Sequence, residues 1–156
     1  LARCRKLNYA EIAKIARDYF NEKFQFASDF LLGARYYAGL QKYKMASFHL
    51  HQATENYLRT IPLVYILYGY KDHALEILMD RCKTHTLQLV SVFPRNTEEE
   101  RRLFNLLQDA YVQARYNKDF VVTKTDIDAL IPRLELMRDI TEKVCCDRIA
   151  YYERQS

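Results

Sequence analysis

The stretch KMASFHLHQATENYLRTIPLVYILYGY, residues 44–70, decides the fold. Apolar residues recur in it at intervals of four and three, the spacing that places side chains on one face of an α-helix. They are Ala46, Leu50, Ala53, Tyr57, Ile61, Val64 and Tyr68. We predict a helix from about Lys44 to Tyr68 whose apolar face belongs to the core. Pro62 removes a backbone hydrogen bond to Leu58 and is expected to kink the helix, and Gly69 is a natural stop.

The same periodicity predicts helices on both sides of this stretch. The first runs from Asn8 to Gln41, and its apolar residues are Ile12, Ile15, Tyr19, Phe26, Phe30, Ala34 and Tyr37. The pattern leaves open whether this long helix bends near Phe24 or Gly33. A third helical region is predicted from about Asp72 to Phe93, with a break near Thr84–Thr86.

Capping signals indicate where two further helices start. In NTEEERRLF, residues 96–104, Thr97 and Glu100 have the spacing of a capping box, so a helix should begin at Glu98. In VTKTDID, residues 122–128, Thr125 or Asp126 is expected to cap the last helix, which continues to the tyrosines near the end of the chain. Pro132 either starts that helix afresh or kinks it.

The composition is that of a helical protein, because only three glycines and three prolines occur among 156 residues and 49% of the residues are hydrophobic. Short connections between long amphipathic helices make neighbouring helices antiparallel. We therefore predict an all-α, up-and-down bundle of four to five helices. It forms a single domain over residues 9–156, preceded by a linker remnant at residues 1–8.

Charge, cysteines and hydrophobicity bear on partners and location. The net charge of +4 comes from 24 basic and 20 acidic residues that are interspersed, so it does not by itself indicate nucleic-acid binding. Cys4, Cys82, Cys145 and Cys146 form no CxxC pair and no disulfide-dense pattern, which favours a reducing, cytoplasmic setting. The longest apolar run, residues 61–70, is about half of the roughly 20 residues that a membrane span needs. No membrane association is expected.

The spacing of histidine and cysteine does not favour a metal site. His49 and His51 are two residues apart, so on a helix they point in directions about 200° apart. Cys82 and His85 are three apart, but no second pair stands at the distance that zinc sites use. We expect neither a metal nor a cofactor.

Polar residues follow the face of the 44–68 helix that lies opposite the apolar stripe. They are His51, Gln52, Glu55 and Arg59. One interpretation is a solvated face with ordinary pairs of residues four apart. The other is a polar seam that faces another helix of the bundle, an interpretation that Phe48 beside His51 supports.

The segment DAYVQARYNKDF, residues 109–120, places Tyr111 and Arg115 one helical turn apart and Tyr116 directly after them. Arg115 is either a solvated arginine that interacts with the helix dipole, or a guanidinium that stacks on Tyr111. In the second case it presents its donors to a phosphate or a carboxylate.

Three of these segments occur in an order that resembles the HEPN family, the higher eukaryotes and prokaryotes nucleotide-binding domains. They are FHLHQATE at residues 48–55, KDHALEIL at 71–78 with His73, and AYVQARY at 110–116. The similarity covers roughly residues 26–153 and is greatest to HEPN domains found C-terminal to a polymerase-beta-type nucleotidyltransferase domain. The resemblance implies a helical bundle that often dimerises, with a site between the helix bearing Gln52 and Glu55 and the helix bearing Arg115.

Some members of that family are metal-independent endoribonucleases, whose motif is an arginine followed after four to six residues by a histidine. After Arg115 those positions hold Phe120, Val121 and Val122, and no histidine follows His85. Metal-independent RNA cleavage needs a group that exchanges protons near neutral pH, and histidine is the usual one. An active site here would therefore need His51 or His73 from another part of the chain.

We expect a binding module that holds a nucleotide or the end of an RNA or DNA strand, or presents a substrate to a nucleotidyltransferase domain. Arg115 would hold a phosphate and Tyr111 or Tyr116 would stack on a base. The polar face of the 44–68 helix, including His51 and Arg59, would orient these groups or contact the ligand. Two alternatives remain: a toxin-type endoribonuclease, and a structural dimerisation module whose aromatic residues serve core and interface. A homodimer is compatible with all three.

Overall fold

The structure is a computed structural model that describes residues 8–156, and in this range it contains only α-helices and the loops between them. The five helices are α1 (Tyr9–Gly39), α2 (Tyr43–Ile66), α3 (Leu75–Lys83), α4 (Glu98–Tyr116) and α5 (Lys124–Gln155). The predicted all-α bundle is therefore confirmed. The linker predicted at residues 1–8 lies outside the described residues except for Asn8, whose side chain accepts a hydrogen bond from the Glu11 backbone and caps α1.

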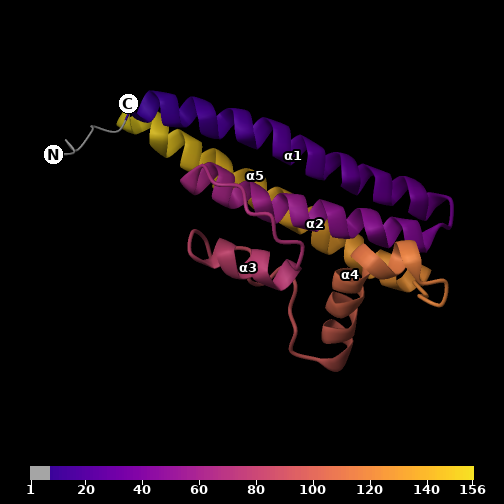
Figure 1. Cartoon of the computed structure of the whole chain (residues 1–156). Helices are drawn as coiled ribbons and strands as arrows, with labels where there is room; N and C mark the ends of the chain where they lie inside the picture. The colour runs from indigo at the N-terminus through magenta and orange to yellow at the C-terminus, as the bar shows by residue number, and fades with distance from the viewer. Residues whose placement is uncertain (1–7) are drawn as a thin grey trace.

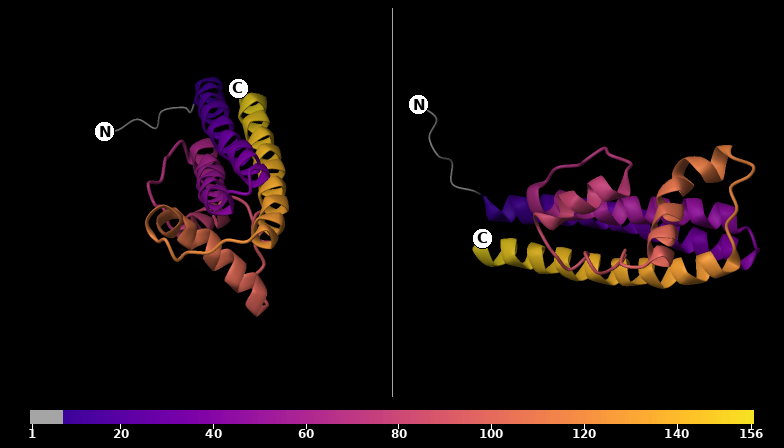
Figure 2. Two further views of the ribbon diagram at one scale, coloured as in Figure 1. Left: turned by 90° about the vertical axis from the view of Figure 1, so that its right-hand side faces the viewer. Right: turned by 90° about the horizontal axis from the view of Figure 1, so that it is seen from below.

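The helix α2 is the centre of the molecule and contacts each of the other four helices. Figure 1 shows α1, α2 and α5 lying side by side, with α1 and α2 antiparallel across a short turn. The short α3 and the crossing α4 lie on the side of α2 away from α1, as the end-on view of Figure 2 shows. A helix that is covered on all sides must bury its polar residues as well as its apolar ones, and this condition creates the site described below.

The apolar face predicted for α2 is buried from Ala46 to Val64, but Tyr68 is 55% exposed and lies beyond the helix. The prediction that Gly69 ends the helix is also wrong. The helix ends at Ile66, and Leu67 takes the left-handed conformation with φ 55°. The hydroxyl of Tyr152 in α5 donates to two backbone carbonyls in the last turn of α2, Val64 at 2.8 Å and Tyr65 at 2.9 Å. These bonds satisfy groups that a longer helix would have paired internally.

The helix α2 continues through Pro62 without interruption. Proline has no N–H, so the carbonyl of Leu58 loses its usual helical donor. The buried thiol of Cys82 in α3 donates to that oxygen at 3.2 Å. Burial raises the pKa of this thiol to about 12, which keeps it protonated as a donor. Cys82 therefore has a structural role in holding α3 on α2.

Helix α1 forms over the predicted residues, but its predicted core face is only partly right. Ala34 is buried, and Ile12, Phe30 and Tyr37 pack against the core, whereas three other predicted residues do not. Ile15, Tyr19 and Phe26 are 42%, 39% and 50% exposed. The fully buried residues of α1 are mostly small: Ala13, Ala16, Phe20, Ala27, Leu31 and Ala34. Small side chains allow close approach to α2 and α5, and Tyr19, Phe26 and Tyr36 face outward.

One glycine of α1 is required by this close approach. A Cβ atom added to Gly33 would lie 2.7 Å from Cδ2 of His49, which is too close for any real contact. The His49 ring packs at this point against Phe30 and Tyr37 of α1. Gly33 therefore makes room for a histidine of α2 in the helix interface.

The third predicted helical region is shorter than expected. The break near Thr84 is confirmed, but the helix starts at Leu75 and not at Asp72, and residues 84–97 form turns and bends. The buried side chains of Leu89, Val92 and Phe93 pack into the core from this irregular segment. Apolar residues at helical spacing can thus be buried without a helix when tertiary contacts hold the chain.

The caps of the last two helices show one correct and one wrong prediction. Thr97 and Glu100 form the predicted capping box at the start of α4. The cap of α5 is Thr123, and neither Thr125 nor Asp126; Asp126 is the acidic partner in that capping box. Its carboxylate also accepts from Arg102 of α4 at 2.7 Å, a contact between helices that favours this register. Pro132 lies inside α5 and does not start the helix.

No helix in the described part of the chain is long and apolar enough to cross a lipid bilayer.

Candidate functional site: an arginine, a tyrosine and a buried carboxylate

The polar face of α2 is a buried seam and not a solvated surface. His51, Glu55 and Arg59 are four residues apart and therefore lie along one side of the helix. His51 is only 1% exposed and Glu55 2%. The loop before α3 and the helix α4 cover this side (Figure 1). Of the two interpretations left open by the sequence, the structure selects the polar seam facing its neighbours.

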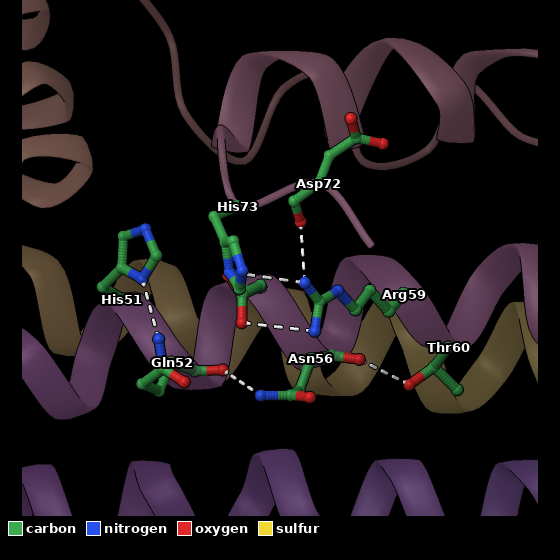
Figure 3. Close-up of polar contacts among 8 residues, drawn as sticks. His51, Gln52, Asn56, Arg59, Thr60, Asp72 and His73 are labelled. Atoms are coloured by element: carbon green, nitrogen blue, oxygen red, sulfur yellow. Dashed lines mark hydrogen bonds and ion pairs between the residues drawn. The ribbon is translucent and has the colours of Figure 1, made fainter. Parts of the chain in front are cut away.

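The Glu55 carboxylate organises the loop that crosses this seam. Its Oε1 accepts a hydrogen bond from Nδ1 of His73 at 2.7 Å, and its Oε2 lies 3.4 Å from the Arg59 guanidinium. Another guanidinium nitrogen of Arg59 donates to the backbone carbonyl of Asp72 at 2.7 Å (Figure 3). A carboxylate can only accept here, so Nδ1 of His73 carries the proton. These contacts explain why Asp72 and His73 stay outside α3.

His73 is placed as an exposed imidazole with a fixed orientation. Its side chain is 55% exposed although its carboxylate partner is buried. The ring stacks on Tyr111 of α4, with centroids 4.9 Å apart and planes 14° apart. Since Nδ1 is bound to Glu55, Nε2 is the ring nitrogen left to contact a ligand.

Tyr111 joins α2, the loop and α4 into one cluster. Besides His73, its ring packs against His51 with centroids 5.1 Å apart and against Phe48 with centroids 6.4 Å apart. The guanidinium of Arg115 lies 4.5 Å from the centre of the same ring. His73 and Arg115 therefore belong to one aromatic cluster, a relation that the sequence alone could not decide.

Arg115 is held at the surface of this cluster by aromatic rings. Its guanidinium lies over Phe48 and Tyr116 as well as Tyr111, at 5.1, 4.9 and 4.5 Å from the ring centroids. Its Nε donates to the Tyr111 carbonyl at 2.8 Å, and its terminal nitrogens form no hydrogen bond to any residue between 8 and 156. Arg115 and Tyr116 are both exposed. The arrangement fixes a planar cation and leaves its outer donors free for an anion.

His51 differs from His73 in its chemistry. Burial, together with the positive charges of His73, Arg59 and Arg115, lowers the pKa of His51 to about 4. The Gln52 amide donates to Nδ1 of His51 at 3.2 Å, so that nitrogen is the acceptor. His51 is thus neutral at physiological pH and packs as a polar aromatic residue. It cannot exchange protons near neutrality.

The sequence matches the HEPN domain family over residues 20–144. The chain belongs to the HEPN family. The matched range includes α2, α4 and every residue of the cluster just described. No protein with a curated description matches the chain.

In this HEPN domain, the structure places all seven residues predicted to bind a ligand in or beside one cluster. Four come from α2 (His51, Gln52, Glu55 and Arg59) and three from α4 (Tyr111, Arg115 and Tyr116). Gln52 contacts the cluster only through His51. Its side-chain amide donates to that ring, and its backbone carbonyl accepts from the Asn56 side chain at 2.7 Å. The contribution of Asp72 was missed. It acts through a backbone carbonyl, which no side-chain pattern reveals.

The histidine and cysteine pairs weighed as metal ligands have other partners in this HEPN domain. His49 packs among aromatic rings on the α1 side, and its Nδ1 lies 3.0 Å from the Met45 carbonyl. The ring of His85 stacks on Tyr65 with centroids 5.2 Å apart. Within residues 8–156, no group of three or more His, Cys, Asp or Glu residues has the geometry to hold a metal ion.

Proposed function

We propose that this HEPN domain binds a nucleotide or the end of an RNA or DNA strand at Arg115. The observation that carries the proposal is the exposed guanidinium of Arg115, fixed by three aromatic rings with its terminal nitrogens free of partners among residues 8–156. Such a group binds a phosphate with little loss of side-chain freedom. Tyr116, which is 76% exposed, offers a ring on which a base can stack.

The buried seam of α2 supports this site from behind. Glu55 and Arg59 fix His73, and His73 supports Tyr111 through a stacked contact. A surface ion pair would not give such rigidity, but the Glu55 carboxylate is 3% exposed and bound from two sides. We infer that Glu55 and Arg59 position the site and that Arg115, His73 and Tyr116 contact the ligand.

Calorimetric titration with ATP, GTP and a short single-stranded RNA tests this proposal. The matched control is Lys118→Ala, which removes an exposed cation from the loop that follows α4. Arg115→Ala should weaken binding by about tenfold or more, the effect of losing hydrogen bonds to a charged group, whereas Lys118→Ala should have a much smaller effect. Equal loss in both variants would show a nonspecific charge effect and contradict a site at Arg115.

The proposal includes two partners that the resemblance suggests. One is a polymerase-beta-type nucleotidyltransferase domain, in this chain or another, to which the module would present its ligand. The other is a second copy of the chain. The exposed apolar residues Leu32 and Tyr36, one turn apart near the C-terminal end of α1, support self-association. Light scattering on the purified chain, with Leu32→Glu as the variant, tests the homodimer: a monomeric wild-type chain would contradict it.

A second candidate function, metal-independent endoribonuclease, is favoured by the pairing of Glu55 with His73. Nε2 of His73 would accept the proton of a ribose 2′-hydroxyl while the 2′-oxygen bonds to phosphorus. The bond from phosphorus to the 5′-oxygen then breaks, and that oxygen takes a proton from the imidazolium or from water. Arg115 would stabilise the charge on the phosphoryl oxygens. The low pKa of His51 makes His73 the better of the two histidines considered for this role.

An RNA cleavage assay in the presence of EDTA decides between the two candidates. An endoribonuclease would lose its activity in His73→Gln and Glu55→Gln and keep it in His85→Gln, a control at a different aromatic contact. RNA binding without cleavage by the wild-type chain would contradict the nuclease and leave the binding module.

A further inference from the structure

A second place suited to an anionic ligand lies on the opposite side of the loop that carries His73. The loop of residues 67–74 borders two hollows, and Tyr70 and Lys71 line both of them. The smaller hollow, of about 330 Å³, lies between α1, α2 and the loop. Its volume falls within the range of about 300–1,000 Å³ that is usual for small-molecule pockets. None of its lining residues is Tyr111, Arg115 or Tyr116.

Unpaired positive charge lines this smaller hollow. Lys23 of α1 and Lys71 of the loop both line it, and neither forms an ion pair with another residue of the described chain. The Lys23 ammonium lies over the Phe26 ring, with Nζ 5.8 Å from the centroid. Arg59 also lines the hollow, but Glu55 compensates its charge. Glu22 is the single carboxylate in the lining, so the two lysines leave a net positive site.

Two tyrosines line the same hollow as these lysines. Tyr19 and Tyr70 line the smaller hollow, and Tyr19 is 39% exposed. The Arg81 guanidinium covers Tyr70 at 4.1 Å from its ring centroid. Arg81 lines the larger hollow and not the smaller one. Tyrosine rings beside free lysines are the combination that binds bases and phosphates together.

We propose that this smaller hollow is a second ligand site and that it binds a nucleoside phosphate, either free or at the 5′ end of a strand. Lys23 and Lys71 bind the phosphate, Tyr70 and Tyr19 contact the base, and Glu22 accepts a hydrogen bond from the base or the ribose. The proposal stands on residues separate from the Arg115 site and does not depend on the function proposed there. Arg59 borders both places, which is why it is unsuitable as a test variant.

Nuclear magnetic resonance with AMP as the probe tests the site. AMP should shift the backbone amide signals of Gly69 and Lys71 in the wild-type chain, and adenosine should shift them much less. Lys71→Gln and Lys23→Gln should each weaken AMP binding roughly tenfold, as expected when one hydrogen bond to a charged group is lost. Lys118→Gln is the matched control for an exposed lysine elsewhere and should bind AMP as the wild type does.

The Arg115→Ala variant distinguishes this site from the Arg115 site. It should bind AMP in the smaller hollow as the wild type does, even if it has lost affinity for RNA. A 5′-phosphorylated RNA trinucleotide added to the AMP complex distinguishes the two sources of the phosphate. Displacement of AMP supports a strand end, and failure to displace it supports a free nucleotide. The inference is overturned if millimolar AMP leaves Gly69 and Lys71 unshifted, or if AMP affinity is the same in both lysine variants as in the wild type.

Discussion

Two arginines of this HEPN domain are surrounded by aromatic rings, near opposite ends of α2. The guanidinium of Arg148 lies 5.1, 4.7 and 5.0 Å from the ring centroids of Tyr65, Tyr151 and Tyr152. The Arg115 guanidinium lies 5.1, 4.5 and 4.9 Å from its three rings. The cation–π contacts are alike in number and distance. They therefore cannot by themselves distinguish a structural arginine from one that binds a ligand.

The surroundings of the two arginines differ. Arg148 is half-buried, and its Nε is buried with no hydrogen-bond partner in the described part of the chain. The same cluster holds Tyr152, whose hydroxyl attaches α5 to the end of α2. Arg115 is exposed, and the Glu55–His73 pair lies beside its cluster. Exposure and the buried Glu55 carboxylate distinguish the Arg115 cluster. The rings and a neighbouring histidine do not, because His85 stacks on Tyr65 in the Arg148 cluster.

The largest expected loss of stability is for Glu55, the buried carboxylate that lies beside the Arg115 cluster. Glu55→Ala leaves the Arg59 guanidinium without its carboxylate in a buried setting and should lower the free energy of unfolding by about 3 kcal/mol or more. Urea unfolding measures this. The control is Glu76→Ala, which breaks an exposed pair with Arg95 and should cost at most about 1 kcal/mol. Similar values for the two variants would show that Glu55 is not an organising residue.

The pH dependence of the free energy of unfolding should show that His51 is buried in its neutral form. Burial lowers its pKa in the folded chain to about 4, from the ordinary value of 6.5, so between these pH values the unfolded chain binds a proton that the folded chain does not. Stability from this group is complete above pH 6.5. It should fall by about 1.4 kcal/mol for each pH unit between about 6.5 and 4. His51→Asn should show a shallower slope over that window, and an unchanged slope would contradict the buried neutral histidine. His85, whose pKa burial also lowers, contributes equally to both proteins and cancels in the difference.

The next largest loss of stability is expected for Arg148. Arg148→Ala takes a partly desolvated cation away from three rings and should cost about 2 kcal/mol of unfolding free energy. The affinity for RNA should not change, because Arg148 contacts Tyr65 at the end of α2 whereas Arg115 contacts Phe48 near its start. Thermal unfolding and an RNA titration on the same sample check both statements. Loss of RNA affinity without loss of stability would reverse the roles given to the two clusters.

The smallest effect on stability is expected for Arg115. Arg115→Ala removes an exposed side chain from the end of a helix and should change the free energy of unfolding by no more than about 1 kcal/mol. Urea unfolding of this variant beside Arg148→Ala measures the contrast directly. A cost at Arg115 as large as that at Arg148 would mean that both clusters are structural.

The sequence predicted those features that depend on residues close together in the chain. The capping box of Thr97 set the start of α4, and the spacing of Leu50, Tyr57 and Ile61 identified the buried face of α2. The same spacing was only partly right in α1, where Ile15, Tyr19 and Phe26 are exposed. That helix has apolar residues on two faces, and periodicity cannot say which of them packs on a neighbour. The alanines decide it, through a close approach that only the folded structure shows.

The candidate site shows the same limit. The seven residues of α2 and α4 could be named from the sequence because two helical faces and one family resemblance pointed to them. The pairing of Glu55 with His73 joins positions 18 residues apart across a loop, and its companion contact uses the backbone of Asp72. No periodic signal encodes such contacts. The cap of α5 is a different case, because Thr123 and Asp126 have the same capping-box spacing in the sequence as Thr97 and Glu100.

The central claim is that one aromatic cluster binds a ligand while the other holds the helices together. Fluorescence anisotropy with a short labelled single-stranded RNA, measured for Arg115→Ala and Arg148→Ala at a temperature where both are folded, tests it most directly. We predict about tenfold or greater loss of affinity in Arg115→Ala and wild-type affinity in Arg148→Ala. Equal affinities in the two variants, whether both reduced or both unchanged, would contradict the division of roles.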